Sequence, residues 1–195
     1  MSKIRADSTA PAAKRSVPIA PSHALDAVDL HILELLRQRG RMTNVQIASR
    51  VGVSPPPALR RTRTLEEAGY IQGYHARLNA KALGYPVTAF LFVGLKWQRA
   101  SEIAAFERKL RSWPLVREYH ALTGQTDYLL KCVARESGDI HRLVSDGLLK
   151  TDNVVSVRTA FCMGVTKDEP GPPLSLPTLP AAKPPTRSLR LPPLR

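Results

Sequence analysis

The stretch SPPPALRRTRTLEEAG, residues 54–69, most constrains what this chain can fold into. Ala58, Thr62 and Leu65 recur at spacings of four and three, which is the period of a helix with one apolar face. A short helix of this kind packs on protein with one face and is free to meet an anionic surface with the other. The remaining side chains of the same turns point away from the apolar face, namely Arg60, Arg61, Arg63 and Thr64.

A second short helix is predicted just upstream, in TNVQIASRVGV at 43–53. Thr43 is suited to cap it, and Gly52 supplies a turn in which a positive φ costs little. Helix, glycine turn and arginine-bearing helix is the layout of a helix-turn-helix, whose second helix enters the major groove of DNA. The alternative is an arginine-bearing surface helix in some other bundle. The DNA-binding hypothesis assigns the interface to Thr43, Asn44, Ser54, Pro56, Pro57, Arg60, Arg61, Arg63 and Thr64.

A third helix is predicted at 25–39, where Val28, Ile32, Leu35 and Leu36 fall on one face. Gly40 ends it. The inner face of the second helix consists of Ile47, Ala48 and Val51. Three helices with matching apolar faces predict one small bundle.

Three prolines, residues 55–57, follow Ser54 at the start of the arginine-bearing helix. A capping serine accepts a hydrogen bond from the N–H of the second or third helical residue, and both are proline here, so Ser54 cannot cap in the ordinary way. We expect the regular helix to start nearer Pro57 and the free Ser54 hydroxyl to donate to a phosphate. Beyond the helix, YIQGYHARL at 70–78 predicts a strand bent at Gly73, either a wing or a connector.

Residues 79–166 predict a different fold. The expected order is strand 87–95, helix 100–111, strand 116–123, strand 128–133, helix 139–150 and strand 154–163. βαββαβ is the ferredoxin-like unit, an antiparallel sheet with both helices on one face. The strand TAFLFVGL is apolar on both sides, so we expect a second subunit to cover the open face. The predicted fold class is therefore α+β, a winged helix-turn-helix followed by a ferredoxin-like domain.

Charge restricts the partners. Lys and Arg number 29 against 16 Asp and Glu, a net charge of +13 at pH 7. This balance favours nucleic acid first and a membrane surface second. No apolar run approaches the ~20 residues of a transmembrane helix, and no signal peptide is recognisable, so we expect a cytoplasmic protein without a membrane partner. Cys132 and Cys162 lie in predicted strands and are expected as buried thiols rather than a disulfide.

The two ends of the chain show no periodicity. Residues 1–23 predict a disordered basic arm, and 168–195 holds many of the 17 prolines and predicts an extended, unpacked tail. Both are expected to be solvated. Contact of the arm with DNA phosphates, and recognition of the tail by a proline-binding domain, are the alternatives.

The whole pattern resembles one family, the Lrp/AsnC transcriptional regulators. The matching stretches are LDAVDLHILELLRQRGRMTNVQIASRVGVS, LRRTRTLEEAGYIQGYHARLNAKALG, VTAFLFVGL and TGQTDYLL. The resemblance implies a DNA-binding domain at 24–70, a linker at 71–82, and a RAM-type effector-binding and oligomerisation domain at 83–167. It implies a nucleoid-associated regulator that binds double-stranded DNA, needs no cofactor, responds to an amino acid and dimerises through its sheet, often as octamers of four dimers. A dimer would favour a near-palindromic operator.

The resemblance also implies an effector site between sensor domains, around the turn in LTGQTDYLL. Family members usually carry Gly, Asp or Glu, Tyr or Phe, then Asp in this turn; Gly124 and Asp127 fit, while Gln125 and Thr126 depart. A glycine lets backbone N–H groups meet a carboxylate, and Asp127 can accept the α-ammonium of an amino acid. The alternative is a plain hairpin turn in which Asp127 bonds its own backbone. The candidate effector residues are Leu122, Thr123, Gly124, Thr126, Asp127 and Thr159.

Two further functions compete with a ligand-modulated regulator. A nucleoid-type architectural protein would bind DNA with little sequence preference, so its affinity for its own promoter would match its affinity for random DNA. An enzyme is disfavoured because no Cys/His pair has metal spacing, no nucleophile elbow occurs and no Gly-rich phosphate loop is present. His120 and His141 are isolated in the sequence. We therefore predict no catalytic and no metal-binding residues.

Overall fold

The computed structural model describes residues 23–179, which form two compact units. One consists of 23–76 with 169–179, and the other of Arg77–Asp168. The predicted basic arm lies outside the described residues except for His23, and so does the predicted tail after 179.

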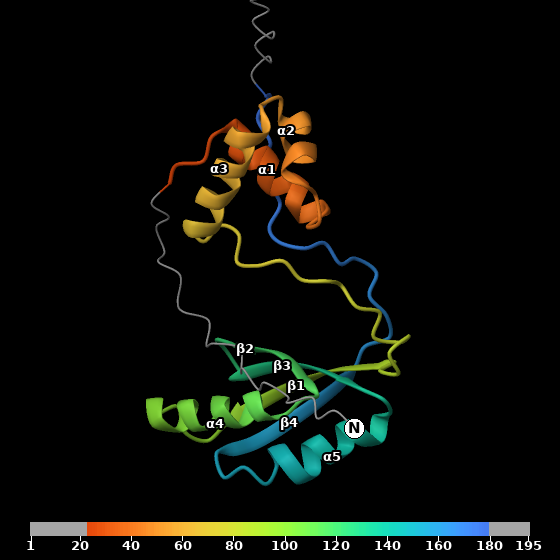
Figure 1. The fold of residues 1–195 in the computed structure, drawn as a ribbon. Helices are drawn as coiled ribbons and strands as arrows, with labels where there is room; N and C mark the ends of the chain where they lie inside the picture. The colour runs from red at the N-terminus through yellow and green to blue at the C-terminus, as the bar shows by residue number, and fades with distance from the viewer. Residues whose placement is uncertain (1–22, 180–195) are drawn as a thin grey trace, which may run out of the picture. The chain divides into compact units, whose positions relative to one another are not determined.

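Three helices form the first unit: α1 (Ala27–Gln38), α2 (Asn44–Val51) and α3 (Pro55–Glu67) (Figure 1). Each contributes its apolar face to one core, which confirms the predicted bundle. Gly52 adopts φ 74° at the end of α2, the left-handed conformation that lets the chain turn into α3. The buried core residues are Val28, Ile32, Leu36, Ile47, Ala48, Val51, Ala58 and Leu65.

The start of α3 differs from the expectation. Ser54 makes no side-chain capping bond, as predicted, yet the helix begins at Pro55 rather than near Pro57. The first helical N–H groups have no intrahelical partner in any helix, so prolines cost little there, and their fixed φ fits the helix. The first regular bond runs from the Ala58 N–H to the Ser54 carbonyl at 3.3 Å.

The second unit is a four-stranded antiparallel sheet in the order β2-β3-β1-β4. Its elements are β1 (Val87–Leu95), α4 (Ala100–Ser112), β2 (Val116–Ala121), β3 (Tyr128–Ala134), α5 (Ser137–Arg142), the π-helix η1 (Leu143–Leu148) and β4 (Val154–Phe161). This is the predicted ferredoxin-like order. The last predicted helix is instead divided into α5 and η1, and the strands β2 and β4 end two residues earlier than expected.

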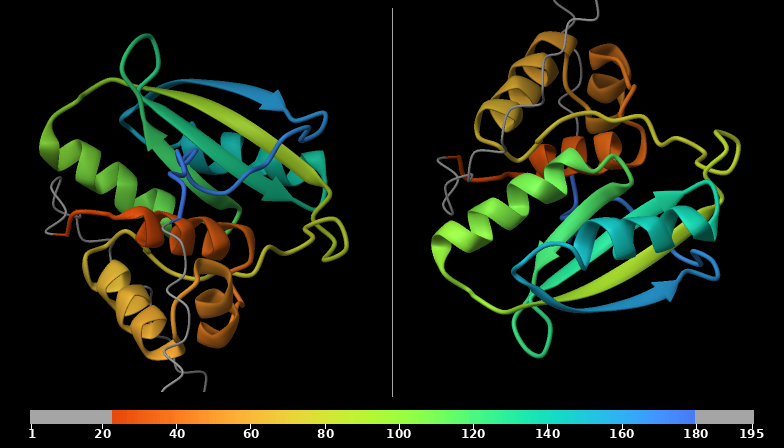
Figure 2. Two further views of the ribbon diagram at one scale, coloured as in Figure 1. Left: turned by 90° about the horizontal axis from the view of Figure 1, so that it is seen from above. Right: turned by 90° about the horizontal axis from the view of Figure 1, so that it is seen from below.

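Both helices pack on the same face of this sheet, as the two views of Figure 2 show. Buried side chains of β1 and β3 alternate toward them, and Phe106 meets Tyr128 edge-on at 5.2 Å between ring centroids. Phe106, Leu110, Ile140 and Leu148 complete this core from the helices. No helix in the described range is long and apolar enough to span a bilayer.

The opposite face of the sheet carries aromatic and aliphatic side chains that no helix within Arg77–Asp168 covers. Phe90 and Phe92 alternate with the buried residues of β1 and are half-buried. Leu129 pairs with Phe92 across the sheet. The Arg158 guanidinium lies 4.0 Å from the centre of the Phe92 ring. A sheet that buries apolar groups on one face and retains them on the other is typical of an interface.

Two predicted features differ in the connecting segments. No strand forms at 70–78, because this segment has no strand to pair with, and Tyr70 and Ile71 pack against the helical core instead. The segment at 168–179 is extended as predicted, but it is not unpacked, since Leu179 lies against the same core. Cys132 is buried, whereas Cys162 is half-buried just beyond β4, and both are free thiols.

Candidate nucleic-acid interface and effector site

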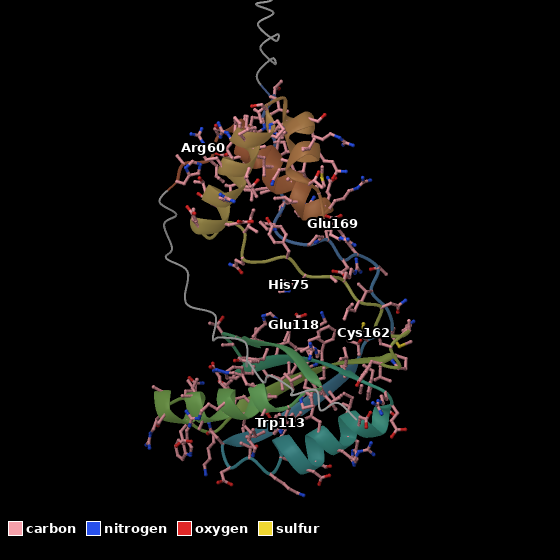
Figure 3. The ribbon with its side chains drawn as sticks, viewed as in Figure 1. Arg60, His75, Trp113, Glu118, Cys162 and Glu169 are labelled. Carbon is pink, nitrogen blue, oxygen red and sulfur yellow. The ribbon has the colours of Figure 1, made fainter. Side chains whose placement is uncertain are left out.

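Two arginines of α3 form an exposed cationic face of the first unit. Arg60 and Arg63 lie on the side of the helix opposite the buried Ala58 and Leu65. Both are exposed, and neither guanidinium has a hydrogen-bond or ion-pair partner within residues 23–179. Figure 3 labels Arg60 on α3. Their guanidinium groups are therefore available for the bidentate contacts that arginine makes with guanine edges or phosphates.

Arg61 is placed differently from the prediction, because its side chain turns inward. Its Nη1 donates to Asp26 Oδ2 at 2.7 Å and to Asp29 Oδ1 at 2.8 Å. Asp29 is only 1% exposed. Position 61 lies three residues after Ala58 and four before Leu65, so it borders the apolar face, and this spacing was the signal that sequence reasoning missed.

The carboxylate of Asp29 is the centre of this arrangement. It accepts from His23 Nε2 at 3.0 Å and from the Asp26 backbone N–H at 3.2 Å, in addition to Arg61. Burial raises the pKa of Asp29, but the hydrogen bonds from His23 and Arg61 outweigh it and leave the pKa below its usual value. The hydrogen bond to Asp29 raises the pKa of Arg61 in turn. Arg61 thus ties α3 to the start of α1.

Several other predicted DNA-binding side chains already serve the helices. The Thr43 hydroxyl caps α2 by accepting from the Gln46 N–H at 3.3 Å. The Thr64 hydroxyl donates to the Arg60 carbonyl at 3.1 Å. Ser54 is exposed and its side chain makes no hydrogen bond within the described part of the chain, so its hydroxyl is free. Pro56 is exposed, whereas Asn44 and Pro57 are half-buried.

A further basic feature, which sequence reasoning missed, lies beside α2. A cavity of about 720 Å³ is bordered by Arg39, Arg41 and Arg50, with the exposed Val45 in its lining. Arg39 and Arg41 stand on the loop before α2, and Arg50 stands near its end. Only the three-dimensional return of this loop against α2 brings the three cations together.

The predicted effector turn of the second unit is bonded to neighbouring segments through its aspartate. Asp127 Oδ2 accepts the Leu95 N–H at 2.6 Å, and Oδ1 accepts from Gln98 Nε2 at 2.7 Å. The carboxylate therefore bonds the end of β1 and the loop after it, and not its own backbone. Each oxygen retains a second lone pair for a ligand. Gly124 has φ 121°, which only glycine adopts easily, and a methyl group there would meet open space.

Thr159 is not brought near this turn. It lies on the edge strand β4, which the order β2-β3-β1-β4 separates from the β2–β3 turn. Thr159 and Phe161 instead line a cavity of about 440 Å³ with Ser137 and His141 of α5. The six candidate effector residues thus fall into two groups within one chain: Leu122, Thr123, Gly124, Thr126 and Asp127 in the turn, and Thr159 at the cavity.

Within residues 23–179, no group of three or more His, Cys, Asp or Glu side chains could hold a metal ion. His120 lies 3.6 Å from Glu118, and His141 borders the cavity beside β4. Burial raises the pKa of the Cys132 thiol to about 12, which leaves it protonated and a poor nucleophile near neutral pH.

Comparison with known proteins connects both units to regulators. Residues 88–172 match the Lrp/AsnC ligand binding domain, and residues 25–72 match a winged helix-turn-helix DNA-binding domain. The leucine-responsive regulatory protein of Rhizobium meliloti is 50% identical over 144 residues, which cover 74% of this chain and 92% of that protein. The Bkd operon transcriptional regulator of Pseudomonas aeruginosa is 35% identical over 150 residues, covering 77% and 98% of the two chains.

Solved structures give the same result. A transcriptional regulator of Neisseria meningitidis in complex with L-methionine superposes with a TM-score of 0.73 at 34% identity, covering 77% of this chain and 97% of that one. AsnC of Escherichia coli superposes with a TM-score of 0.68 at 26% identity, covering 75% and 97%. In each comparison nearly all of the relative is matched, and about a quarter of this chain lies outside the match.

Proposed function

Since this chain belongs to the Lrp/AsnC family of transcriptional regulators, we propose that its α3 reads an operator through Arg60 and Arg63. The observation that carries the proposal is their exposure and freedom on the face of α3 opposite the core. Each guanidinium that reaches a guanine edge would contribute roughly 1–3 kcal/mol of discrimination. Ser54 and the three arginines beside α2 would contact DNA phosphates on either side of the bases that α3 reads. Arg61 positions the helix and makes no base contact. The site of action is the chromosome in the cytoplasm.

The regulator acts as a homodimer through the open face of its sheet. Phe90, Phe92, Leu129 and Val133 are the apolar groups that this contact would remove from water. Two recognition helices would then address half-sites about one turn of DNA apart, which makes a near-palindrome the expected operator. Four such dimers would give the octamer. Phe92→Asp should convert the dimer to a monomer in size-exclusion chromatography with light scattering, and a dimer that persists would place the interface elsewhere.

The effector is an amino acid or a related small zwitterion. The turn around Asp127 offers a carboxylate and backbone N–H groups, and the cavity at Thr159 offers hydroxyl and apolar surface, as an amino acid requires. Because one chain keeps these two groups apart, the site is complete only where the turn of one subunit meets the cavity of another. The Neisseria relative, solved with L-methionine, supports this class of ligand.

A mobility-shift assay tests the DNA contact. Arg60→Ala and Arg63→Ala should each weaken operator binding by about tenfold or more while leaving the thermal midpoint nearly unchanged, because both side chains are exposed and neither guanidinium has a hydrogen-bond or ion-pair partner in the described part of the chain. Arg108→Ala, an exposed arginine of α4, is the matched control and should bind as the wild type does. Equal affinity of the wild type for operator and random DNA at one salt concentration would instead support an architectural role.

A further inference from the structure

The segment 169–179, called the strap below, belongs to the DNA-binding unit although it follows the sensor sheet in sequence. It forms one compact unit with α1, α2 and α3, and the sheet unit ends at Asp168. The chain therefore leaves the helical unit once, after 76, and returns to it once, at 169. The helices are connected to the sensor by two covalent segments rather than one.

The strap is held to α1 by an arginine that is itself fixed in place. Arg37 Nε and Nη2 donate to the two carboxylate oxygens of Glu34, each at 2.8 Å. The remaining Nη1 donates to the Pro170 carbonyl at 3.2 Å. Gly171, with φ 69°, passes close to the Arg37 methylene groups, and a side chain at this position would be strained.

An apolar contact fixes the far end of the strap. Leu179 packs against the helical core and is half-buried, whereas Leu176 is 44% exposed and lies outside that core. The match to the family's ligand binding domain ends at residue 172, so the Leu179 contact is formed by sequence beyond it.

The other end of the strap is connected through a short segment to β4, which lines the cavity that contains Thr159. Thr159 and Phe161 of β4 line that cavity, and the seven residues 162–168 join β4 to the strap. The Cys162 N–H donates to the Thr88 carbonyl at 2.8 Å, so this connection leaves the sheet at a defined point. Arg77 pairs with Asp168 at 2.5 Å, so the two residues at which the chain enters and leaves the sensor unit are joined. Figure 3 labels Cys162 and Glu169 at the two ends of the connection.

We propose that the strap is a second tether through which occupation of the cavity beside β4 changes the freedom of α1, and thereby the DNA affinity of the helical unit. A ligand that orders the end of β4 reduces the number of conformations open to residues 162–168. Because the strap connects these residues to α1, the conformational freedom of α1 is reduced as well. Coupling of this kind requires only that the ligand bind differently to the two conformational populations. This inference rests on the proposed amino-acid effector.

Two variants of the full-length protein separate docking of the strap from transmission through it. Leu179→Ser removes the apolar anchor, and Leu176→Ser is its matched control. Insertion of six Gly/Ser residues after Gly164, where a side chain would meet open space, lengthens the tether and leaves the docked residues unchanged. The readouts are amide hydrogen exchange of α1 and operator affinity with and without each of the twenty standard amino acids.

Leu179→Ser should speed exchange across α1 by about tenfold, since local opening then needs less free energy, while Leu176→Ser should not change it. The insertion should keep α1 protected but reduce the amino-acid effect on affinity from about fivefold or more to under twofold. If Leu179→Ser leaves the exchange of α1 unchanged, the strap does not stabilise the helices through Leu179. If the insertion variant keeps the full amino-acid effect on operator affinity, the strap does not transmit ligand binding to α1. If no amino acid changes the operator affinity of the wild type, the proposed effector is wrong, and so is transmission of its binding through the strap. Operator binding would still test the role of α3, and hydrogen exchange would still test whether the strap packs on the helices.

Discussion

Replacing Arg61 should damage the helical unit itself and not merely its contact with DNA. In Arg61→Met the aliphatic stem is retained, but Asp29 loses the guanidinium that holds its buried carboxylate. The position of α3 against the start of α1 depends on that bond and on the partner bond to Asp26. We expect lower stability, with loss of operator binding only as a consequence.

The magnitude follows from the burial of the pair. Breaking a fully buried ion pair costs about 3–5 kcal/mol, because the remaining charge is left unpaired in a poorly solvated place. Arg61 is 31% exposed, and Asp29 keeps its bonds to His23 and the Asp26 N–H, so we expect about 2 kcal/mol. At about 4–8 °C per kcal/mol for a small domain, the midpoint of the helical unit should fall by about 8–16 °C.

Thermal unfolding, monitored by circular dichroism, measures the shift of the midpoint. Arg60→Ala is the matched comparison on the same helix. The double variant Arg61→Met/Asp29→Leu should recover much of the loss, since it removes both charges together. Below the unfolding transition, Arg61→Met should still bind the operator. An Arg61→Met protein with an unchanged midpoint and no operator binding would refute the reasoning and make Arg61 a base-reading residue.

Acid should weaken the same cluster. The pKa of Asp29 is lowered in the folded state, so its ionised form stabilises the fold fully above the unfolded value of about 3.9. As pH falls below that value toward the folded pKa, this contribution is lost. The stability of Arg61→Met should depend less on pH below about 4 than that of the wild type, and an identical acid profile in both proteins would contradict the assignment.

Three further outcomes are expected. At pH 8 a thiol reagent should modify the native protein at Cys162 and not at Cys132, because burial raises the pKa of the Cys132 thiol to about 12. Cys162→Ser should abolish the fast reaction, and Cys132→Ser should retain it. Gly94→Ala should cost about 1–3 kcal/mol of stability, because a methyl group there would lie 2.6 Å from Ser156 Oγ, and Ser156→Ala should restore part of it; no recovery would contradict that clash. Operator affinity should fall linearly with the logarithm of salt concentration, with a slope of about −0.9 per phosphate contacted, and a flat dependence would exclude the cationic face as the binding surface.

The periodic elements were predictable because each is built on a repeated apolar face. Val87–Leu95 forms a strand that is apolar on both faces, as its sequence predicted, and α3 buries the three residues whose spacing predicted it. The inward turn of Arg61 follows from the same spacing once Asp26 and Asp29 are known to lie opposite. Helical phase could separate Arg61 from Arg60 and Arg63, but it could not identify the partner on α1.

What could not be predicted depends on contacts between distant segments. A strand needs a neighbour, and YIQGYHARL has none, so its alternation does not become a strand. The Pro-rich segment has no periodicity of its own, yet Leu179 gains an apolar partner on helices more than a hundred residues earlier. The separation of Thr159 from the turn at 122–127 likewise results from the strand order.

The return of the chain at 169 also fixes an order of events during synthesis. The three helices leave the ribosome first, the whole sensor follows, and the strap emerges afterwards. In a nascent polypeptide the three helices therefore lack the contact with Leu179 until the sheet has been translated. Premature termination anywhere in the sensor would release the three helices without the Leu179 contact, and we expect proteases to cleave them faster than in the full-length protein.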